Sequence, residues 1–197
     1  LSGHPLLKYA DELEEFSNYD FTDKVVANNE KTVRIGGSIS ELKMHFDRKN
    51  NQMAFFKLEC LGGQVEILTF SDTFSKYRSV IANDAVVFVK GKPTDGSDFS
   101  DLKLIADEII PLDKARDFYS KNVNIRLEPS KMSLDDVDSL YSMVKDHKGK
   151  CGLMIHISTN MKKDSRIFSH NIKVSSHPSF LKKLRDNYGK ENIWVSD

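Results

Sequence analysis

Residues 32–39 read TVRIGGSI, and this stretch decides the fold. Its apolar residues Val33, Ile35 and Ile39 alternate with polar ones, which is typical of a β-strand with one buried face. A glycine pair at 36–37 interrupts the alternation. Because glycine weakens a strand, the pair indicates a sharp bend or a close approach of another backbone. We therefore expect one long strand that curls and serves both sides of a small closed barrel.

Four more strand-like segments and a short helix follow along the chain. They are AFFKLEC (54–60), QVEILTF (64–70), a helix over 72–81, AVVFVKG (85–91) and LKLIADEIIP (102–111). Three strands, a helix that plugs the barrel and two further strands are the order of the OB fold, a five-stranded Greek-key barrel. The sequence thus predicts a mainly β domain of this type. We also expect a polar loop over 41–52 and core positions at one barrel mouth for Phe70, Phe74 and Tyr77.

The segments on either side of the barrel carry helical patterns. A helix is predicted from Pro5, with an apolar stripe formed by Leu6, Leu7, Ala10, Leu13 and Phe16. Residues 17–31 are polar and indicate an irregular linker. The predicted domains are residues 1–30 (helix and linker), 31–117 (OB-fold domain) and 118–197 (a small α+β domain).

The last domain has the order β-α-β-β-α-β, which places two helices on one face of a small sheet. Ser133 begins the first helix as a capping residue. The buried face expected for that helix consists of Leu134, Val137, Leu140, Tyr141 and Val144. Residues 165–175 fit either one bent strand or a pair of strands. The segment Ser176-His177-Pro178 is expected to cap the second helix.

Composition limits the class of protein. The chain has 197 residues, 39% of them hydrophobic, and a net charge of zero. The charge is uneven, at −5 over residues 1–30, 0 over 31–117 and +5 over 118–197. No apolar run approaches the roughly 20 residues that span a bilayer, so we expect no membrane contact. With two distant cysteines, neither a disulfide framework nor a four-ligand zinc site is expected, and a cytoplasmic location is the default.

Alternation in the second strand suggests a binding surface. If Ala54, Phe56 and Leu58 face the barrel core, then Phe55 and Lys57 point outward together. An exposed ring can stack on a base and a cation can contact a phosphate, and OB barrels bind oligonucleotides across the second and third strands. Further cations at the rim are expected to be Lys43, His45, Arg48 and Lys49 from the preceding loop and Lys90 and Lys92 from the fourth strand. Alternatively, Phe55 packs under a neighbouring domain and the lysines only aid solubility.

Catalytic signatures are missing from the sequence. It has no GxxxxGK[ST] loop, no GxGxxG after a strand, no GxSxG and no HExxH. Asp95, Asp98 and Asp101 lie in one hairpin, but their spacing lacks the twelve-residue calcium loop with its terminal Glu. We therefore expect no catalytic residue, no metal site and no cofactor.

Several motifs in order resemble a known family. SGHPLLKYADEL, TVRIGGSI, MAFFKLE, QVEILTF, KYRSVI, VVFVKGK and LIADEIIPLDKAR together resemble the C-terminal part of the bacterial replicative DNA polymerase III α subunit over residues 2–116. The resemblance of the last domain is in outline only.

The resemblance implies a role for each part of the chain. It implies that the barrel contacts the single-stranded DNA template, and that the last domain engages the clamp-loader τ subunit beside other replisome subunits. It also implies a non-catalytic region, because the polymerase palm precedes this part of the family. By position it adds Arg34, at the start of the first strand, to the candidate DNA contacts, and it marks Phe55 as the aromatic residue of the AFFKLE strand.

Two other readings remain open. The chain could be a protein-interaction module without DNA binding, whose basic last domain binds an acidic partner. It could also be the anticodon-binding OB domain of a tRNA synthetase.

Overall fold

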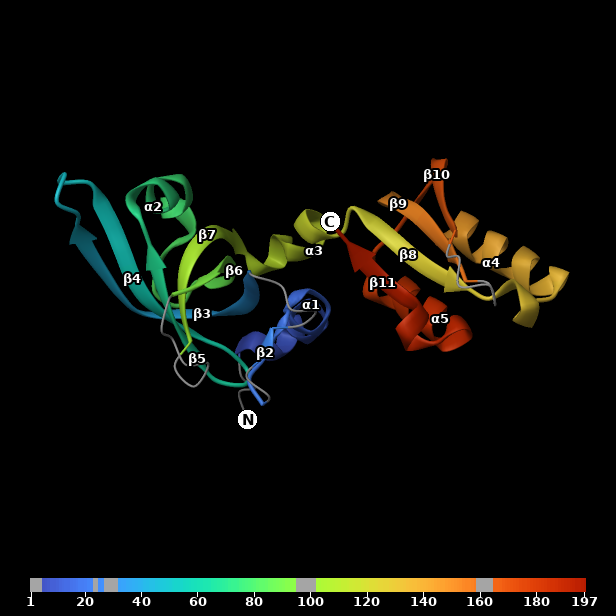
Figure 1. Cartoon of the computed structure of the whole chain (residues 1–197), viewed down its shortest axis with the longest axis horizontal. Helices are drawn as coiled ribbons and strands as arrows, with labels where there is room; N and C mark the ends of the chain where they lie inside the picture. The colour runs from blue at the N-terminus through green and yellow to red at the C-terminus, as the bar shows by residue number, and fades with distance from the viewer. Residues whose placement is uncertain (1–4, 23–24, 27–31, 95–101, 159–164) are drawn as a thin grey trace. The chain divides into compact units, whose positions relative to one another are not determined.

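The computed structural model describes residues 5–22, 25–26, 32–94, 102–158 and 165–197 (Figure 1). The hairpin predicted to contain Asp95, Asp98 and Asp101 and the turn predicted at 160–164 lie outside these residues. Two compact units are present, residues 1–115 and residues 116–197. Within the described residues, no helix is both long enough and apolar enough to cross a lipid bilayer.

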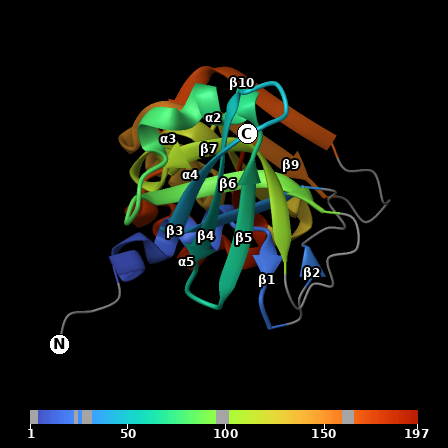
Figure 2. The same cartoon turned by 90° about the vertical axis from the view of Figure 1, so that its left-hand side faces the viewer.

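The first unit contains a closed five-stranded barrel. Its strands are β3 (Val33–Phe46), β4 (Gln52–Glu59), β5 (Gln64–Thr69), β6 (Val86–Pro93) and β7 (Lys103–Pro111), in the spatial order β3-β4-β5-β7-β6. All pairs are antiparallel except β5 with β7. Figure 2 shows β3, β4 and β5 side by side. The predicted OB fold is confirmed.

The glycine pair makes the curl of β3 possible. The first half of β3 pairs with β6 and the second half with β4, so one strand closes the barrel on both sides. A Cβ on Gly37 would lie 2.6 Å from the backbone oxygen of Glu59, and a Cβ on Gly36 would overlap the side chain of Leu13. Both positions therefore need a residue without a side chain, because neighbouring groups occupy the space.

Short helices cover parts of the barrel. They are η1 (Pro5–Tyr9), α1 (Ala10–Phe16), α2 (Ser71–Tyr77), η3 (Arg78–Val80) and η5 (Leu112–Lys114). The α1 helix packs on β3 and buries Leu13 and Phe16, and η1 before it buries Leu6. Leu7 is 56% exposed and Ala10 is exposed, so the predicted stripe was too wide: one turn of 3₁₀ helix precedes the α-helix and rotates these two residues outward.

Part of the segment predicted as an irregular linker forms strands. Tyr19–Asp20 (β1) pairs with Val25–Val26 (β2), and Tyr19 belongs to the barrel core. The Asn18 side chain accepts a hydrogen bond from the backbone N–H of Arg34 (2.6 Å) and donates one to the carbonyl of Thr32 (2.9 Å). These contacts tie the segment to β3, which a polar composition could not reveal.

Two further expectations for the barrel were wrong. The loop predicted at 41–52 is mostly strand, because β3 and β4 stay paired as far as Phe46 and Gln52 in a hairpin that extends from the barrel (Figure 1). Phe70 is 49% exposed because it precedes α2 as its N-cap, whereas Phe74 is buried and Tyr77 partly buried against the core.

The second unit is the predicted β-α-β-β-α-β arrangement. After α3 (Ala115–Tyr119), which is divided between the units, come β8 (Asn122–Leu127), η6 (Pro129–Lys131), α4 (Leu134–Asp146), β9 (Lys148–Ile157), β10 (Ser165–Val174), α5 (Pro178–Tyr188), η7 (Lys190–Asn192) and β11 (Ile193–Ser196). The sheet order is β10-β9-β8-β11, with β8 and β9 parallel. The segment at 165–174 is one irregular strand.

Both helices of the second unit pack into one core. Leu140 and Val144 of α4 and Phe180, Leu181 and Leu184 of α5 meet Val123, Ile125, Leu153 and Ile193 of the sheet. Ser133 caps α4 in a reciprocal capping box with Asp136, and His177 caps α5. The predicted buried face of α4 was wrong for three residues: Leu134, Val137 and Tyr141 are 84%, 50% and 57% exposed. Their stripe lies beside that of Leu140 and Val144 and is not covered by the sheet.

Candidate nucleic-acid interface

The outer surface of β4 and β5 carries an exposed aromatic ring in an apolar row. Lys43 on β3 pairs with Phe55 on β4, which pairs with Leu68 on β5. Phe55 is 39% exposed, whereas its neighbours Ala54 and Phe56 are buried. The His45 and Phe55 rings pack in a T-shaped pair, with a centroid distance of 5.1 Å and an interplanar angle of 89°. A planar ligand therefore finds one ring already held in position.

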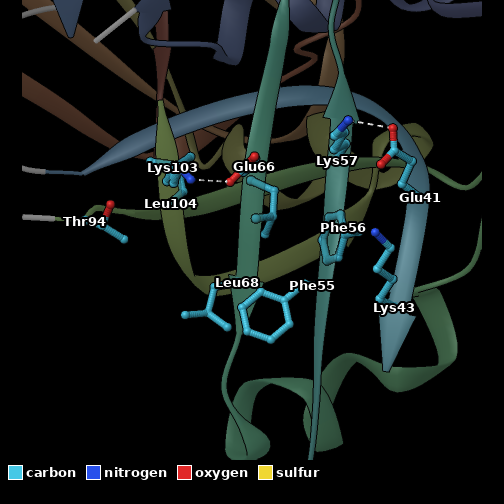
Figure 3. Close-up of a pocket in the computed structure, with 11 residues that line it drawn as sticks. Glu41, Lys43, Phe55, Phe56, Lys57, Glu66, Leu68, Thr94, Lys103 and Leu104 are labelled. Carbon is cyan, nitrogen blue, oxygen red and sulfur yellow. Dashed lines mark hydrogen bonds and ion pairs between the residues drawn. The ribbon is translucent and has the colours of Figure 1, made fainter. Parts of the chain in front are cut away.

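A charged row runs beside the apolar row. Lys57 on β4 pairs with Glu66 on β5, which pairs with Lys103 on β7. Lys57 Nζ lies 2.6 Å from Glu41 Oε1, and Lys103 Nζ lies 2.8 Å from Glu66 Oε2 (Figure 3). The row thus alternates acid, base, acid, base across four strands.

These two rows border a groove of about 310 Å³, which we call the β4–β5 groove. Its lining residues are Glu41, Lys43, Phe55, Phe56, Lys57, Glu66, Ile67, Leu68, Thr94, Lys103 and Leu104 (Figure 3). Three lysines against two glutamates leave the lining with one net positive charge. The groove therefore offers stacking and apolar contact, with modest electrostatic attraction for a polyanion.

A bulge in β3 sets the position of Glu41. The register between β3 and β4 shifts between Ser40 and Lys43, and Glu41 has a φ of 49°, in the left-handed region. Residues other than glycine rarely adopt this backbone conformation, because it has a local cost in free energy. The bulge places the Glu41 carboxylate on Lys57 and sets Lys43 beside Phe55.

The Glu41–Lys57 contact changes the acidity of both groups. The hydrogen bond from Lys57 lowers the pKa of the Glu41 carboxyl below its usual value, and the same bond raises the pKa of the Lys57 ammonium. Both groups are therefore charged at neutral pH. The Lys57 ammonium is therefore already paired with the Glu41 carboxylate, which competes with a phosphate for it.

The other predicted site residues lie at different distances from the groove. Lys43, Phe55 and Lys57 line it. Arg48 and Lys49 lie in the exposed turn of the β3–β4 hairpin, where the backbone N–H of Lys49 donates to the Asp47 carboxylate. Neither basic side chain lines the groove.

The remaining three cations lie on the β6 side of the barrel. Lys92 pairs with Ile105, the neighbour of Leu68 on β7, and so continues the apolar row by two strands. Arg34 lies on β3 nine positions before Lys43 and pairs with Lys90 on β6. The Arg34 guanidinium donates a hydrogen bond to the Phe16 carbonyl at the end of α1. The structure does not bring Arg34 and Lys90 to Phe55.

Sequence reasoning missed several residues of the groove. Lys103, Thr94, Leu68, Glu41 and Glu66 all line it. Lys103 and Glu66 become neighbours only through the parallel β5–β7 pairing. Outward alternation in QVEILT and KLIA was the available signal, but it does not identify which strands meet.

A protein-family model agrees with the fold of the barrel. Residues 33–112 match a family model described as an OB-fold nucleic acid binding domain. Solved structures with a similar arrangement include the mitochondrial single-stranded DNA binding protein Rim1 of S. cerevisiae (18% identity, 40% of this chain, 90% of that chain, TM-score 0.33). Another is the SSB domain of a Synechococcus protein (9% identity, 42% of this chain, 96% of that chain, TM-score 0.36).

Curated relatives cover the whole chain. DNA polymerase III subunit alpha of Pseudomonas fluorescens is 24% identical over 195 residues, which is 99% of this chain and 16% of the relative. The subunit of Escherichia coli K12 is 22% identical over 197 residues, which is 98% of this chain and 17% of the relative. The chain therefore spans about a sixth of the length of these relatives. The resemblance indicated by the sequence motifs is confirmed: the chain is similar from end to end to DNA polymerase III subunit alpha and contains an OB-fold domain.

Proposed function

We propose that the barrel binds single-stranded DNA in the β4–β5 groove during DNA replication, as part of a DNA polymerase III α subunit. The observation that carries the proposal is Phe55, a 39% exposed ring on the outer face of β4, with Lys43 beside it on β3 and Lys57 two residues along β4. A base stacks on the ring, and its phosphates contact the lysines. Curated relatives named DNA polymerase III subunit alpha, from Pseudomonas fluorescens and Pseudomonas aeruginosa, support the setting in replication.

The remaining predicted cations have secondary roles in this proposal. Arg48 and Lys49 extend the phosphate path along the hairpin, and Lys92 extends it around β7. Arg34 and Lys90 make weaker contributions, because they lie on the β6 side and Arg34 already donates to Phe16.

Fluorescence anisotropy with a labelled oligo-dT at low salt tests the proposal. Stacking is worth about 1–3 kcal/mol per base, so Phe55→Ala should weaken binding by roughly 5- to 150-fold. Phe55→Leu is the matched variant that keeps an apolar side chain without an aromatic face and should lose nearly as much. Neutralising Arg48 and Lys49 should flatten the salt dependence without abolishing binding.

Three results would reject this role. No binding of oligo-dT at low salt would favour a protein-interaction module, and equal affinity for wild type and Phe55→Ala would remove the ring from the site. A preference for folded tRNA over single-stranded DNA would favour an anticodon-binding domain. We further infer that the chain itself is non-catalytic, which predicts no nucleotide incorporation on a primed template.

We also propose that the second unit binds the clamp-loader τ subunit, as the resemblance implies. Leu134, Val137 and Tyr141 support a protein partner, because they form an exposed apolar stripe on α4. A double substitution Leu134→Ser and Val137→Ser should abolish retention on immobilised τ. Leu61→Ser, at a 49% exposed position in the first unit, is the control. Undiminished retention of the double variant would exclude the stripe as the contact.

A further inference from the structure

One face of the sheet of the second unit packs against the helices α4 and α5. Val123, Ile125, Leu153 and Ile193 point to the core with α4 and α5. Because side chains alternate along a strand, the residues between them point to the opposite face. We call this opposite side the open face.

Strand pairing aligns the side chains of the open face in three rows. The middle row is Phe168, Met154, Asn124 and Trp194, one residue from each of β10, β9, β8 and β11. One neighbouring row is Arg166, His156 and Arg126, and the other is Lys173, Gly152, Asn122 and Ser196. An aromatic ring therefore stands at each end of the middle row, about 14 Å apart across three strand spacings.

Each ring has a cation close to it. The Arg126 guanidinium lies 5.3 Å from the centroid of the Trp194 ring, and the Lys173 ammonium lies 5.8 Å from that of Phe168. His156 also contacts Trp194, at a centroid distance of 4.8 Å, and its Nε2 shares a 2.9 Å hydrogen bond with Asn124 Oδ1. Rings and cations are thus interleaved across the sheet.

Gly152 gives the Phe168 ring its place on the sheet. A Cβ at this position would lie 2.9 Å from Cε2 of Phe168 and 2.5 Å from Oδ1 of Asn122. The ring therefore lies close over the backbone of β9, and Phe168 remains 38% exposed.

The charge of the open face has one sign. None of the residues in the three rows is acidic. Within the described residues, Arg126, Arg166 and Lys173 make no ion pair with a carboxylate. Residues 118–197 carry a net charge of +5. A ligand that complements this surface has planar groups to stack on the rings and an anionic backbone to contact the cations.

We propose that the open face is a second binding site for single-stranded nucleic acid, separate from the β4–β5 groove. One base stacks at Phe168 and another at Trp194, and the phosphates between them contact Arg126, Arg166 and Lys173. Four-stranded sheets that present aromatic side chains bind single strands by this chemistry. An acidic protein segment would match the cations but leaves the two separated rings without stacking partners.

Trp194 is the single tryptophan of the chain, so its fluorescence reports on this site directly. Titration of the full chain with an oligo-dT of about ten nucleotides at low salt should quench the emission to saturation. The quench should persist in Phe55→Ala, which separates this site from the barrel. Phe168→Ala should weaken the quench-detected affinity roughly 5- to 150-fold, and Lys173→Gln should reduce the slope of log affinity against log salt by about 0.7.

Tyr141→Ala is the matched control. Tyr141 is an exposed ring with Lys145 6.0 Å away, but it lies on α4, on the helix side of the sheet. The control should leave the quench unchanged, and Phe168→Leu, which keeps most of the apolar volume, should weaken it as Phe168→Ala does. The proposal is overturned if Trp194 emission stays constant while anisotropy detects binding. It is equally overturned if the quench disappears in Phe55→Ala, or if poly-glutamate produces the same quench and displaces oligo-dT.

Discussion

Neutralising Glu41 should strengthen DNA binding in the β4–β5 groove. The Glu41 carboxylate holds the Lys57 ammonium at 2.6 Å, and the lining carries three lysines against two glutamates. Glu41→Gln keeps the size of the side chain, removes one negative charge and raises the net charge of the lining from one to two. Lys57 then becomes available to a phosphate.

The size of the effect follows from counterion release. One additional phosphate contact on a single strand changes the slope of log affinity against log salt by about −0.7. If wild type and variant bind equally at 1 M salt, the variant should bind about eightfold more tightly than wild type at about 50 mM salt and about threefold more tightly at about 200 mM. Stability should hardly change, because both members of the ion pair are exposed and such pairs contribute little.

Anisotropy titrations of both proteins at several salt concentrations measure this difference. Asp113→Asn is the matched control, since Asp113 also forms an exposed ion pair, with Lys114 at 3.8 Å, outside the groove lining. The hydrogen bond from Lys57 lowers the pKa of the Glu41 carboxyl below its usual value, so the affinity of the wild type should approach that of the variant only at a pH acidic enough to protonate this carboxyl. An unchanged salt slope in Glu41→Gln, or the same increase in Asp113→Asn, would refute the reasoning.

Three further predictions concern stability and reactivity. Gly37→Ala should lower the free energy of unfolding by about 1–3 kcal/mol in urea titrations. The loss should exceed that of Gly36→Ala, because a Cβ at position 37 meets backbone atoms whereas one at position 36 meets only side chains. Equal losses would contradict this reasoning. Burial raises the pKa of the Cys60 thiol to about 12 from its usual 9.0, so iodoacetamide should label this thiol slowly in the native protein at pH 8. Above pH 9 the thiol ionises more readily in the unfolded chain, so the free energy of unfolding should fall as the pH rises. Fast labelling of the native protein would count against the burial. Ser133→Ala removes the cap of α4 and should cost about 1 kcal/mol, measured by thermal unfolding, whereas Ser133→Asp should retain most of it; a neutral Ser133→Ala would argue that the cap contributes nothing.

The barrel was predictable because its pattern is local. Alternation in β4 separates buried Ala54, Phe56 and Leu58 from exposed Phe55, and the glycine pair identifies the curled strand. Each of these signals depends on neighbours in sequence and on the period of two that every strand shares. The order of the elements then leaves few ways to close the sheet.

The rest of the groove depends on contacts between distant segments. Lys103 reaches Glu66 only because β7 inserts beside β5, and Glu41 reaches Lys57 only because a bulge shifts the register of β3. A bulge adds one residue without changing composition, so alternation cannot locate it. The exposed stripe of α4 shows the same limit: the helical period reveals that Leu134 and Val137 lie near the apolar side, but the width of the sheet beneath decides what is covered.

The insertion of β7 between β5 and β6 has a consequence for synthesis of the protein. The barrel closes only when Lys103–Pro111 is available, although its first strand starts at Val33. At a translation rate of about 5–20 residues per second, the earlier strands wait roughly 4–16 seconds with unpaired edges. During that interval the nascent chain is most vulnerable to aggregation, so a substitution that slows the docking of β7 should lower the soluble yield even where the finished barrel is as stable as before.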